Sequence, residues 1–363
     1  MSANKLNKSE FFKRQTTLKE IGENGQEKLQ NAKIAIIGCG GLGSIAAVYL
    51  AASGIGKIKL IDFDTVNLSN LHRQTFFTLN DVDKPKAEIL AKHIKKITPY
   101  TDVITDLNAI TKQNIKTVLN DYTLILDCTD NLPIKYLIND YCVLNNKTLI
   151  YGSLFKFDGY VATFNFPLSG KRTANLRDAF PKIPTQNIPN CSETGTLNTI
   201  VGIIGLQQAN EVLKIITSIG KPLTNQILIY NTLDNSQFKM KLKPKFTKTE
   251  IEKIYKNETY QVDFCTNQLE EFTISKKDFL QKIKQPDVNI ISVIENQNTI
   301  LPFKKVTKIP LSKLKENPIE LDKNKEYILI CNKGISSYEA TLFFKNKHPN
   351  ITILSLKNGI SNF

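Results

Sequence analysis

This sequence predicts an α/β protein: a doubly wound, Rossmann-like unit followed by a smaller α/β unit. From Lys33 onward short β-branched runs alternate with helical patterns, and a glycine-rich turn directly follows the first run. The alternation resumes after a basic stretch near residue 250. Such alternation is typical of parallel βαβ units. A length of 363 residues also favours two domains over one.

Short apolar runs are the expected strands of the first unit. They are KIAIIG at 33–38, KIKLID at 57–62, YTLILDC at 122–128, TLIYG at 148–152 and ILIYN at 227–231. The alternating run at 159–166 is predicted to begin an antiparallel extension, because no helical segment follows it immediately. Helices are expected over 42–53 and over about 197–218, and Gly220 with Pro222 ends the second.

A change in composition separates the two units. Residues 239–256 are basic and poor in aliphatic clusters, which is typical of a linker. We therefore predict a first domain over 1–243, a linker over 244–268 and a second domain over 269–363. In the second domain the expected strands are 288–294, 327–331 and 351–356, and the expected helix is 336–347.

Charge and hydropathy exclude several classes of function. The net charge is +14, from 48 Lys and Arg against 34 Asp and Glu, but the lysines are dispersed. Dispersed lysines favour a solvated surface or an acidic protein partner over nucleic acid. The polar first twelve residues lack a signal-peptide core, and the most apolar stretch, 199–216, contains Gln, Asn, Glu and Lys. We expect a soluble, cytoplasmic protein that binds neither nucleic acid nor a membrane.

The glycine-rich turn is the first motif with a chemical meaning. Gly38, Gly40, Gly41 and Gly43 lie between an expected strand and an expected helix. Glycine allows a tight turn and a close approach of phosphate to the N–H groups of the helix N-terminus. Asp62 lies 19 residues beyond Gly43, where a carboxylate can accept hydrogen bonds from ribose hydroxyls. Alone, this fingerprint is typical of NAD or FAD binding.

A group of cations after Asp62 favours a triphosphate instead. The segment 62–74 reads DFDTVNLSNLHRQ, and Lys84 and Lys86 follow it. A nicotinamide site needs no cations there, whereas displacement at phosphorus spreads negative charge that Arg, Lys and Mg²⁺ stabilise. An NAD-dependent oxidoreductase remains the alternative from another class.

Several ordered motifs resemble the MoeB/ThiF/HesA family of adenylyltransferases, which are related to ubiquitin-activating enzymes. The resemblance covers about 11–242 and includes IIGCGGLGS at 36–44, LIDFDTVNLSNLHRQ at 60–74, DCTDN at 127–131 and NCSETGTLNTIVGIIGLQQANEVLK at 190–214. It implies adenylation of the C-terminal glycine of a ubiquitin-like sulfur carrier, with ATP and Mg²⁺. The carrier would be MoaD-like, for molybdopterin synthesis, or ThiS-like, for thiamine synthesis. It further implies a homodimer and a sulfur donor such as a cysteine desulfurase.

The resemblance assigns roles by position. It implies that the four glycines cradle ATP and that Asp62 holds the ribose. Asn70, Arg73 and Lys86 would grip the phosphates, and Asp130 would bind Mg²⁺, a hard cation that prefers carboxylate oxygen. Taken singly, Asp130 could instead cap the helix that follows.

Other positions of the resemblance concern the dimer, a covalent link and zinc. Arg14 resembles an arginine that reaches the ATP of the partner subunit, although Phe11 stands where the family usually has a second arginine. In members that link covalently to their carrier, the cysteine lies where this chain has Cys191, which adenylation alone does not require. Family members often hold zinc with two CxxC pairs, expected here within 165–180 and 241–248. Both pairs are absent, so we predict no zinc.

The C-terminal segment 327–344, YILICNKGISSYEATLFF, resembles the active-site half of a rhodanese-like domain. Cys331 would end a strand, and a loop with Gly334 and Ser337 would surround its sulfur before a helix begins. The resemblance implies that Cys331 carries a persulfide and delivers sulfur to the adenylated carrier. Ser336 replaces an arginine common in such loops, so a docking domain with an ordinary buried cysteine is the alternative. Together with the missing CxxC pairs, this change also leaves open a non-catalytic scaffold.

Overall fold

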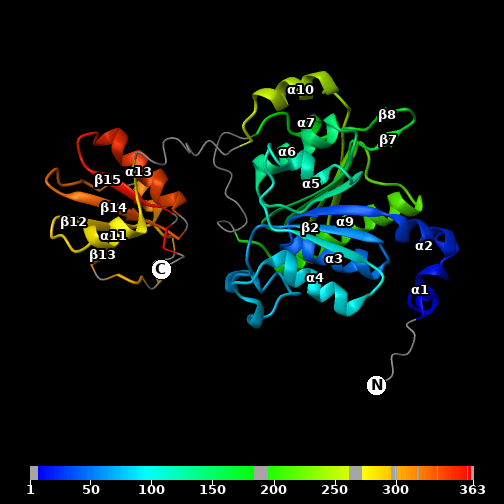
Figure 1. Ribbon diagram of the computed structural model, residues 1–363. Coiled ribbons are helices and arrows are strands. Elements are labelled where there is room, and N and C mark those ends of the chain that lie inside the picture. Colours follow the sequence, from blue (N-terminus) through cyan, green and yellow to red (C-terminus); the bar gives the residue numbers. More distant parts are fainter. Residues whose placement is uncertain are drawn as a thin grey trace. The chain divides into compact units, whose positions relative to one another are not determined.

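The chain folds into two compact units, Met1–Gln261 and Val262–Phe363 (Figure 1). The computed structural model describes residues 7–183, 195–260, 272–295, 299, 301–303, 305–316, 319–332, 334–357 and 359–360. None of the helices in these ranges has the length and apolar character needed to cross a bilayer. Each unit has its own sheet and its own core, so each is described separately.

The first unit is built on an eight-stranded sheet of order β10-β9-β6-β5-β4-β1-β2-β3. Strands β3, β2, β1, β4 and β5 are parallel, and β6, β9 and β10 extend the sheet antiparallel from β5. The antiparallel extension predicted to begin at residue 159 is therefore confirmed. The strands are β1 (Lys33–Ile37), β2 (Lys57–Ile61), β3 (Asp102–Asp106), β4 (Leu124–Asp127), β5 (Thr148–Phe155), β6 (Asp158–Phe164), β9 (Gln226–Asn231) and β10 (Gln237–Lys241). A separate two-stranded hairpin joins β7 (Pro167–Leu168) to β8 (Lys171–Arg172).

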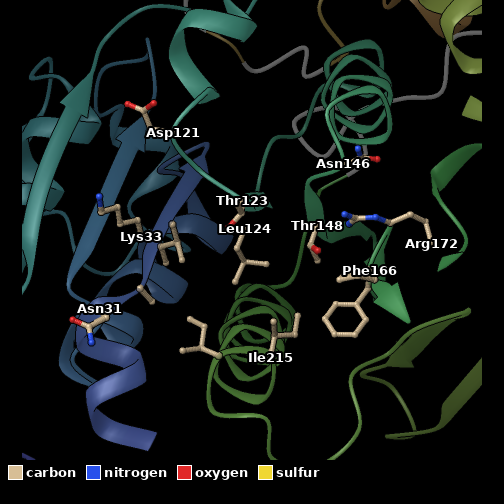
Figure 2. A pocket seen from close by; sticks show the side chains of 14 residues that line it. Asn31, Lys33, Asp121, Thr123, Leu124, Asn146, Thr148, Phe166, Arg172 and Ile215 are labelled. Atoms are coloured by element: carbon tan, nitrogen blue, oxygen red, sulfur yellow. The ribbon is translucent and has the colours of Figure 1, made fainter. Parts of the chain in front are cut away.

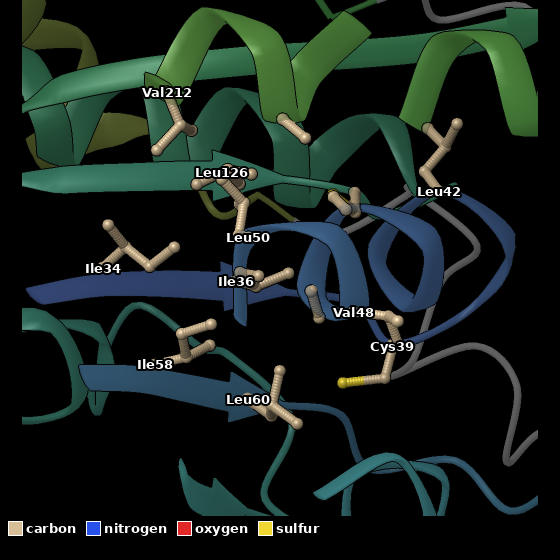
Figure 3. Close-up of a cluster of buried hydrophobic side chains, with 14 of the residues drawn as sticks. Ile34, Ile36, Cys39, Leu42, Val48, Leu50, Ile58, Leu60, Leu126 and Val212 are labelled. Atoms are coloured by element: carbon tan, nitrogen blue, oxygen red, sulfur yellow. The ribbon is translucent and has the colours of Figure 1, made fainter. Parts of the chain in front are cut away.

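Helices cover both faces of this sheet. Side chains of a strand alternate between faces, so Ile34 and Ile36 join one core and Ala35 and Ile37 join the other. The first core contains residues of α2, α3, α4 and α9, and Figure 3 shows part of it. The second contains residues of α5, α6 and α7. The helical segments are α1 (Lys8–Thr16), α2 (Gly22–Asn31), α3 (Gly41–Ala52), η1 (Leu68–Asn70), η2 (Leu79–Asp81), α4 (Lys86–Ile97), α5 (Ile115–Leu119), α6 (Leu132–Leu144), α7 (Leu176–Ala179), α9 (Asn198–Thr217) and α10 (Lys248–Asn257).

The sheet order places a switch point at the carboxyl end of β1. The chain moves from β1 to β2 and β3 on one side, and then crosses to β4 on the other side of β1. Helices that leave neighbouring strands in opposite directions open a crevice at such a point, where ligands bind in α/β sheets. The glycine-rich turn begins at this position, since Gly38 directly follows β1.

The segment predicted as a linker, 244–268, contains the helix α10. Thr247 and Glu250 form a capping box at its N-terminus, and Ile251 is fully buried. The helix packs against α6. Composition alone missed it because its many lysines obscured apolar residues spaced three and four positions apart, a helical pattern. Residues 261–268 of the predicted linker lie outside the described residues.

The second unit has a five-stranded parallel sheet of order β11-β15-β14-β12-β13. Phe279 of α11 packs on one face with Ile328, and Phe344 of α13 packs on the other with Leu329. The predicted strands and the predicted helix are present here. The elements are β11 (Thr273–Ile274), α11 (Lys276–Lys282), β12 (Val288–Ser292), β13 (Val306–Lys308), α12 (Leu311–Glu316), β14 (Glu326–Ile330), α13 (Ile335–Lys347) and β15 (Ile353–Leu356).

A buried ion pair joins α6 to α7 in the first unit. Nε and Nη2 of Arg177 lie 2.8 and 2.6 Å from the carboxylate oxygens of Asp140. The Tyr260 hydroxyl donates a third hydrogen bond to Asp140, at 2.6 Å. Burial, with the nearby Asp140 charge, raises the pKa of Tyr260, so the phenol remains protonated as a donor. These bonds fasten the segment after α10 to α6 and α7.

Replacing Arg177 with Met should lower the free energy of unfolding by about 3–5 kcal/mol, because Asp140 would stay buried without a counter-charge. Urea unfolding measures this loss. As a control, Glu252→Ala breaks an exposed pair with Lys256 and should cost less than about 1 kcal/mol. A loss in Arg177→Met no larger than that of the control would contradict the prediction.

Candidate functional site

The glycine-rich turn is pressed against the backbone that follows β4. Gly38 has a φ of +90°, and a Cβ added there would lie 2.7 Å from the carbonyl oxygen of Cys128. A Cβ added at Gly43 would lie 1.8 Å from the Gly38 carbonyl oxygen. The turn therefore has no room for side chains at these two positions, and its backbone leads straight into the N-terminus of α3, where free N–H groups can bind an anion.

Asp62 follows β2 and is tied directly to this turn. Its Oδ2 accepts from the Cys39 N–H at 2.6 Å, and its Oδ1 accepts from the Asp64 N–H at 2.8 Å. Burial raises the pKa of Asp62 above its usual value, although the charge of Lys86 and these two N–H groups oppose the rise. The carboxylate predicted to hold a ribose is thus brought beside the glycine-rich turn.

Asn70 and Arg73 lie on a segment that packs over the same turn. A Cβ added at Gly41 would lie 3.4 Å from the Arg73 carbonyl oxygen. Arg73 is half-buried, and its Nη1 donates to the Ser69 carbonyl at 3.3 Å. Asn70 accepts from the buried Gln74 side chain at 3.3 Å. The structure therefore brings the expected phosphate-binding segment to the helix N-terminus.

Lys86 is the first residue of α4 and is almost fully buried. Its Nζ lies 3.0 Å from Oδ2 of Asp64, and its backbone N–H donates to the Asp64 carbonyl at 3.0 Å. Its charge also acts on Asp62. Lys86 thus joins the site through Asp64, a carboxylate that we did not single out from the sequence.

Asp130 lies in the loop between β4 and α6 and is exposed. The Asn131 side chain, not Asp130, caps α6, because it accepts from the Ile134 N–H at 3.1 Å. Within the part of the chain that the structure describes, no hydrogen bond or ion pair engages the Asp130 carboxylate. An exposed carboxylate beside the glycine-rich turn is suited to a hard cation.

Two predicted site residues are not brought to this place. Arg14 is exposed on α1, and its neighbour Gln15 donates to the Ser53 carbonyl just beyond α3, at 3.0 Å. The glycine-rich turn lies at the other end of α3, about 18 Å away for twelve residues. Cys191 lies outside the described residues.

Sequence reasoning missed a buried network below Asp130. Lys135 and Asp127 form an ion pair at 3.1 Å, and both side chains are almost completely inaccessible. Gln208 of α9 donates to the Asp127 carbonyl at 2.9 Å. The only sequence signal was that Asp127 belongs to the DCTDN motif. Neither Lys135 nor Gln208 stands out by composition or spacing.

Cys331 occupies the end of β14 in the second unit, as predicted. Its sulfur accepts from the Gly334 N–H at 3.1 Å and lies 3.3 Å from Oγ of Ser337. Ser337 in turn lies 2.9 Å from Oγ of Ser355 on β15. Gly334 caps α13 with a φ of 84°, so the chain turns sharply between the sulfur and the helix. The thiol is 4% exposed.

The largest cavity of the first unit has no part in this site. It measures 530 Å³ and lies at the amino ends of β1, β4 and β5 (Figure 2). Lys33, Asp121 and Arg172 line it together with apolar residues of α9. None of the predicted site residues lines it, because they gather at the opposite, carboxyl edge of the sheet.

Comparison with known proteins identifies the family. The model described as ThiF family matches residues 12–251, about two thirds of the sequence. The chain belongs to the ThiF family. This match confirms the predicted family and covers every described site residue of the first unit.

Curated relatives of this ThiF-family chain match it in two patterns. A Thermus thermophilus protein named sulfur carrier protein adenylyltransferase is 38% identical over 62% of this chain and 84% of its own length. A Porphyra purpurea protein named probable molybdopterin-synthase adenylyltransferase is 40% identical over 64% of this chain, which spans 60% of that relative. A Drosophila grimshawi protein named adenylyltransferase and sulfurtransferase MOCS3 is 29% identical over 96% of this chain and 82% of its own length.

Solved structures agree with the predicted fold class. The crystal structure of Escherichia coli MccB with ATP is 26% identical, with a TM-score of 0.52, over 60% of this chain and 66% of that chain. MccB with succinimide is 24% identical with a TM-score of 0.56, over 64% and 72% of the two chains, and shows the fold alone. The doubly wound α/β prediction is confirmed.

Gly43→Ala should lower the free energy of unfolding by about 1–3 kcal/mol, because the new methyl group would overlap the Gly38 carbonyl oxygen. Gly202→Ala is the matched control in α9, since its Cβ would meet only Cδ1 of Ile45, at 3.9 Å. The control should gain up to about 1 kcal/mol of helix propensity. Urea unfolding distinguishes the two, and equal stabilities would contradict the packing described here.

Proposed function

We propose that this chain adenylates the C-terminal glycine of a ubiquitin-like sulfur-carrier protein, MoaD-like or ThiS-like, using ATP. The observation that carries the proposal is the gathering of the glycine-rich turn, Asp62, Arg73, Lys86 and Asp130 at one edge of one sheet. The names of the Thermus and Porphyra relatives support the same activity and the same class of partner. The cations argue against the NAD-dependent alternative.

The reaction needs alignment and charge neutralisation rather than a covalent catalyst. The carrier carboxylate attacks the α-phosphorus of ATP, pyrophosphate leaves, and an acyl adenylate remains. The N-terminus of α3 would hold the phosphates, and Asp62 would accept the ribose hydroxyls. Arg73, Asn70 and Lys86 would stabilise the charge that develops on the phosphate oxygens. Lys86 would then exchange Asp64 for phosphate.

Magnesium fits this site, whereas zinc does not fit the positions that the family resemblance implies. The exposed carboxylate of Asp130 is available for a cation, and Mg²⁺ bound there would neutralise the phosphate charge. At the implied zinc site, residues 165–180 and 241–248 contain no cysteine. There, Oδ1 of Asp178 accepts from the N–H groups of Lys245 and Phe246 at 2.6 and 2.9 Å, which joins the two segments without metal.

Further parts of the proposal rest on residues away from the site. A homodimer would let Arg14 reach the ATP of the partner subunit, since α1 lies at the far end of α3 from the site in its own chain. Cys191 would be the residue for any covalent link to the carrier. A cysteine desulfurase would be a suitable sulfur donor, and a cytoplasmic location remains our prediction.

For the second unit we propose a sulfurtransferase role. The Gly334 N–H and Ser337 hydroxyl surround the Cys331 sulfur, and the N-terminus of α13 adds a favourable field for an anionic sulfur. The terminal sulfur of a Cys331 persulfide would attack the acyl carbon of the adenylated carrier and displace AMP. A thiol would then reduce the resulting disulfide and release the carrier thiocarboxylate. The name of the Drosophila relative supports this pairing of activities.

Carrier-dependent exchange of labelled pyrophosphate into ATP tests the proposed function. Exchange should appear with Mg²⁺ and one carrier, and a MoaD-like and a ThiS-like carrier tested in parallel decide the pathway. No exchange with either carrier, using folded protein, would contradict the proposal and favour a scaffold. Bound nicotinamide, detected by its absorbance, would instead favour the oxidoreductase.

Asp130→Ala should reduce this exchange by at least about 100-fold at a fixed Mg²⁺ concentration, because loss of electrostatic stabilisation of this kind costs that much. Its melting temperature should stay close to that of the unmodified protein, since the side chain is exposed. Exchange at the normal rate would remove Asp130 from the site.

Cys331→Ala should leave pyrophosphate exchange unchanged and abolish transfer of sulfur from a persulfide donor to the adenylated carrier. Mass spectrometry of the carrier measures the thiocarboxylate product. Cys39→Ala is not a suitable comparison, because that thiol lies within the nucleotide turn; Cys142→Ala, buried behind α6, serves as the control. Normal thiocarboxylate formation by Cys331→Ala would rule out the sulfurtransferase role.

A further inference from the structure

A buried lysine lies beneath the loop that carries Asp130. Lys135 is in the first turn of α6, and its side chain is 2% exposed. Its Nζ lies 3.1 Å from Oδ2 of Asp127 and 2.6 Å from the carbonyl oxygen of Gly152. It also lies over the Tyr151 ring, 4.9 Å from the ring centre. Lys135 thus joins α6 to the carboxyl ends of β4 and β5.

The same carboxylate holds the first part of the Asp130 loop. Oδ1 of Asp127 accepts from the Thr129 N–H at 3.0 Å and from the Thr129 hydroxyl at 2.8 Å. One oxygen of Asp127 therefore bonds the lysine, and the other bonds the residue directly before Asp130. The orientation of the loop depends on where Lys135 holds this carboxylate.

The strand ends below the loop are braced from a third element. Nε2 of Gln208 in α9 donates to the carbonyl oxygens of Asp127 and Ile150 at 2.9 and 3.3 Å. Gly152 leaves the space for this side chain, because a Cβ there would lie 2.3 Å from Cδ of Gln208. The Cys128 carbonyl contacts the turn at Gly38. The network therefore supports both the glycine-rich turn and the loop.

We propose that Lys135 is a positioning residue that fixes Asp127, and through Thr129 the Asp130 carboxylate, for the cation bound with the nucleotide. Replacing a buried ion pair by apolar residues is often neutral or stabilising, so stability gives no reason for this pair. Outer partners of a ligating carboxylate orient it and raise the affinity of the site for metal. The inference rests on the proposed function, because it takes Asp130 as the cation ligand.

Direct binding of Mn²⁺, measured by electron paramagnetic resonance with a non-hydrolysable ATP analogue, tests this role without turnover. Lys135→Met should weaken Mn²⁺ binding about tenfold, and Lys135→Arg should restore most of the affinity. Lys147→Met is the matched control. Lys147 is equally buried but lies at the amino end of β4, where it donates to the carbonyls of Asn120 and Tyr122 at 2.7 and 2.6 Å. The control should bind Mn²⁺ like the unmodified protein.

Two results would overturn the proposal. One is unchanged Mn²⁺ affinity in Lys135→Met, and the other is an equal loss in Lys147→Met, which would indicate general destabilisation. If Lys135→Met does not fold, Thr129→Val decides, since it keeps the ion pair and removes only the hydroxyl bond to Asp127. A weaker Mn²⁺ affinity in that variant supports the proposal, and an unchanged affinity contradicts it.

The measurement separates this inference from the proposed function. Unmodified protein that binds Mn²⁺ with the ATP analogue but shows no carrier-dependent exchange would contradict the proposed reaction. The dependence of that binding on Lys135 would still decide the positioning role. Exchange in the unmodified protein with Mn²⁺ affinity unaffected by Lys135→Met would contradict only the positioning role.

Discussion

The close approach of the glycine-rich turn to the end of β4 is the constraint on which the candidate site depends. A side chain at Gly38 would collide with the Cys128 carbonyl, so the turn can lie against β4 only as bare backbone. This contact places the N-terminus of α3 next to the loop that carries Asp130. Without it, the phosphate-binding end of the helix and the carboxylate would belong to separate parts of the sheet edge.

Charge at this edge is balanced in two tiers. On the surface, Lys86 pairs with Asp64 and also acts on the carboxylate of Asp62. In the interior, Lys135 pairs with Asp127 out of contact with solvent. The exposed tier can exchange partners when a phosphate binds, because water replaces lost contacts cheaply there. The buried tier cannot, since a lone buried charge is costly, and it is therefore suited to holding backbone in place.

The two units follow one design with different chemistry. In each, a parallel strand ends at a turn containing a glycine with positive φ, and the turn leads to the N-terminus of a helix. In the first unit the turn offers bare backbone to a nucleotide. In the second it surrounds the sulfur of Cys331 with an N–H and a hydroxyl. The family model covers the first unit, and the Drosophila relative aligns across both.

The sequence by itself determined the strands, the main helices, the glycine-rich turn and the residues at strand ends, because these follow from local periodicity and from backbone rules for glycine. Only the tertiary structure decided that Asp64 pairs with Lys86, that Lys135 reaches Asp127, and that α10 packs on α6. A lysine reads as solvated in a sequence, since its burial depends on a counter-charge from another element. Packing between distant segments creates that environment, and no local pattern records it.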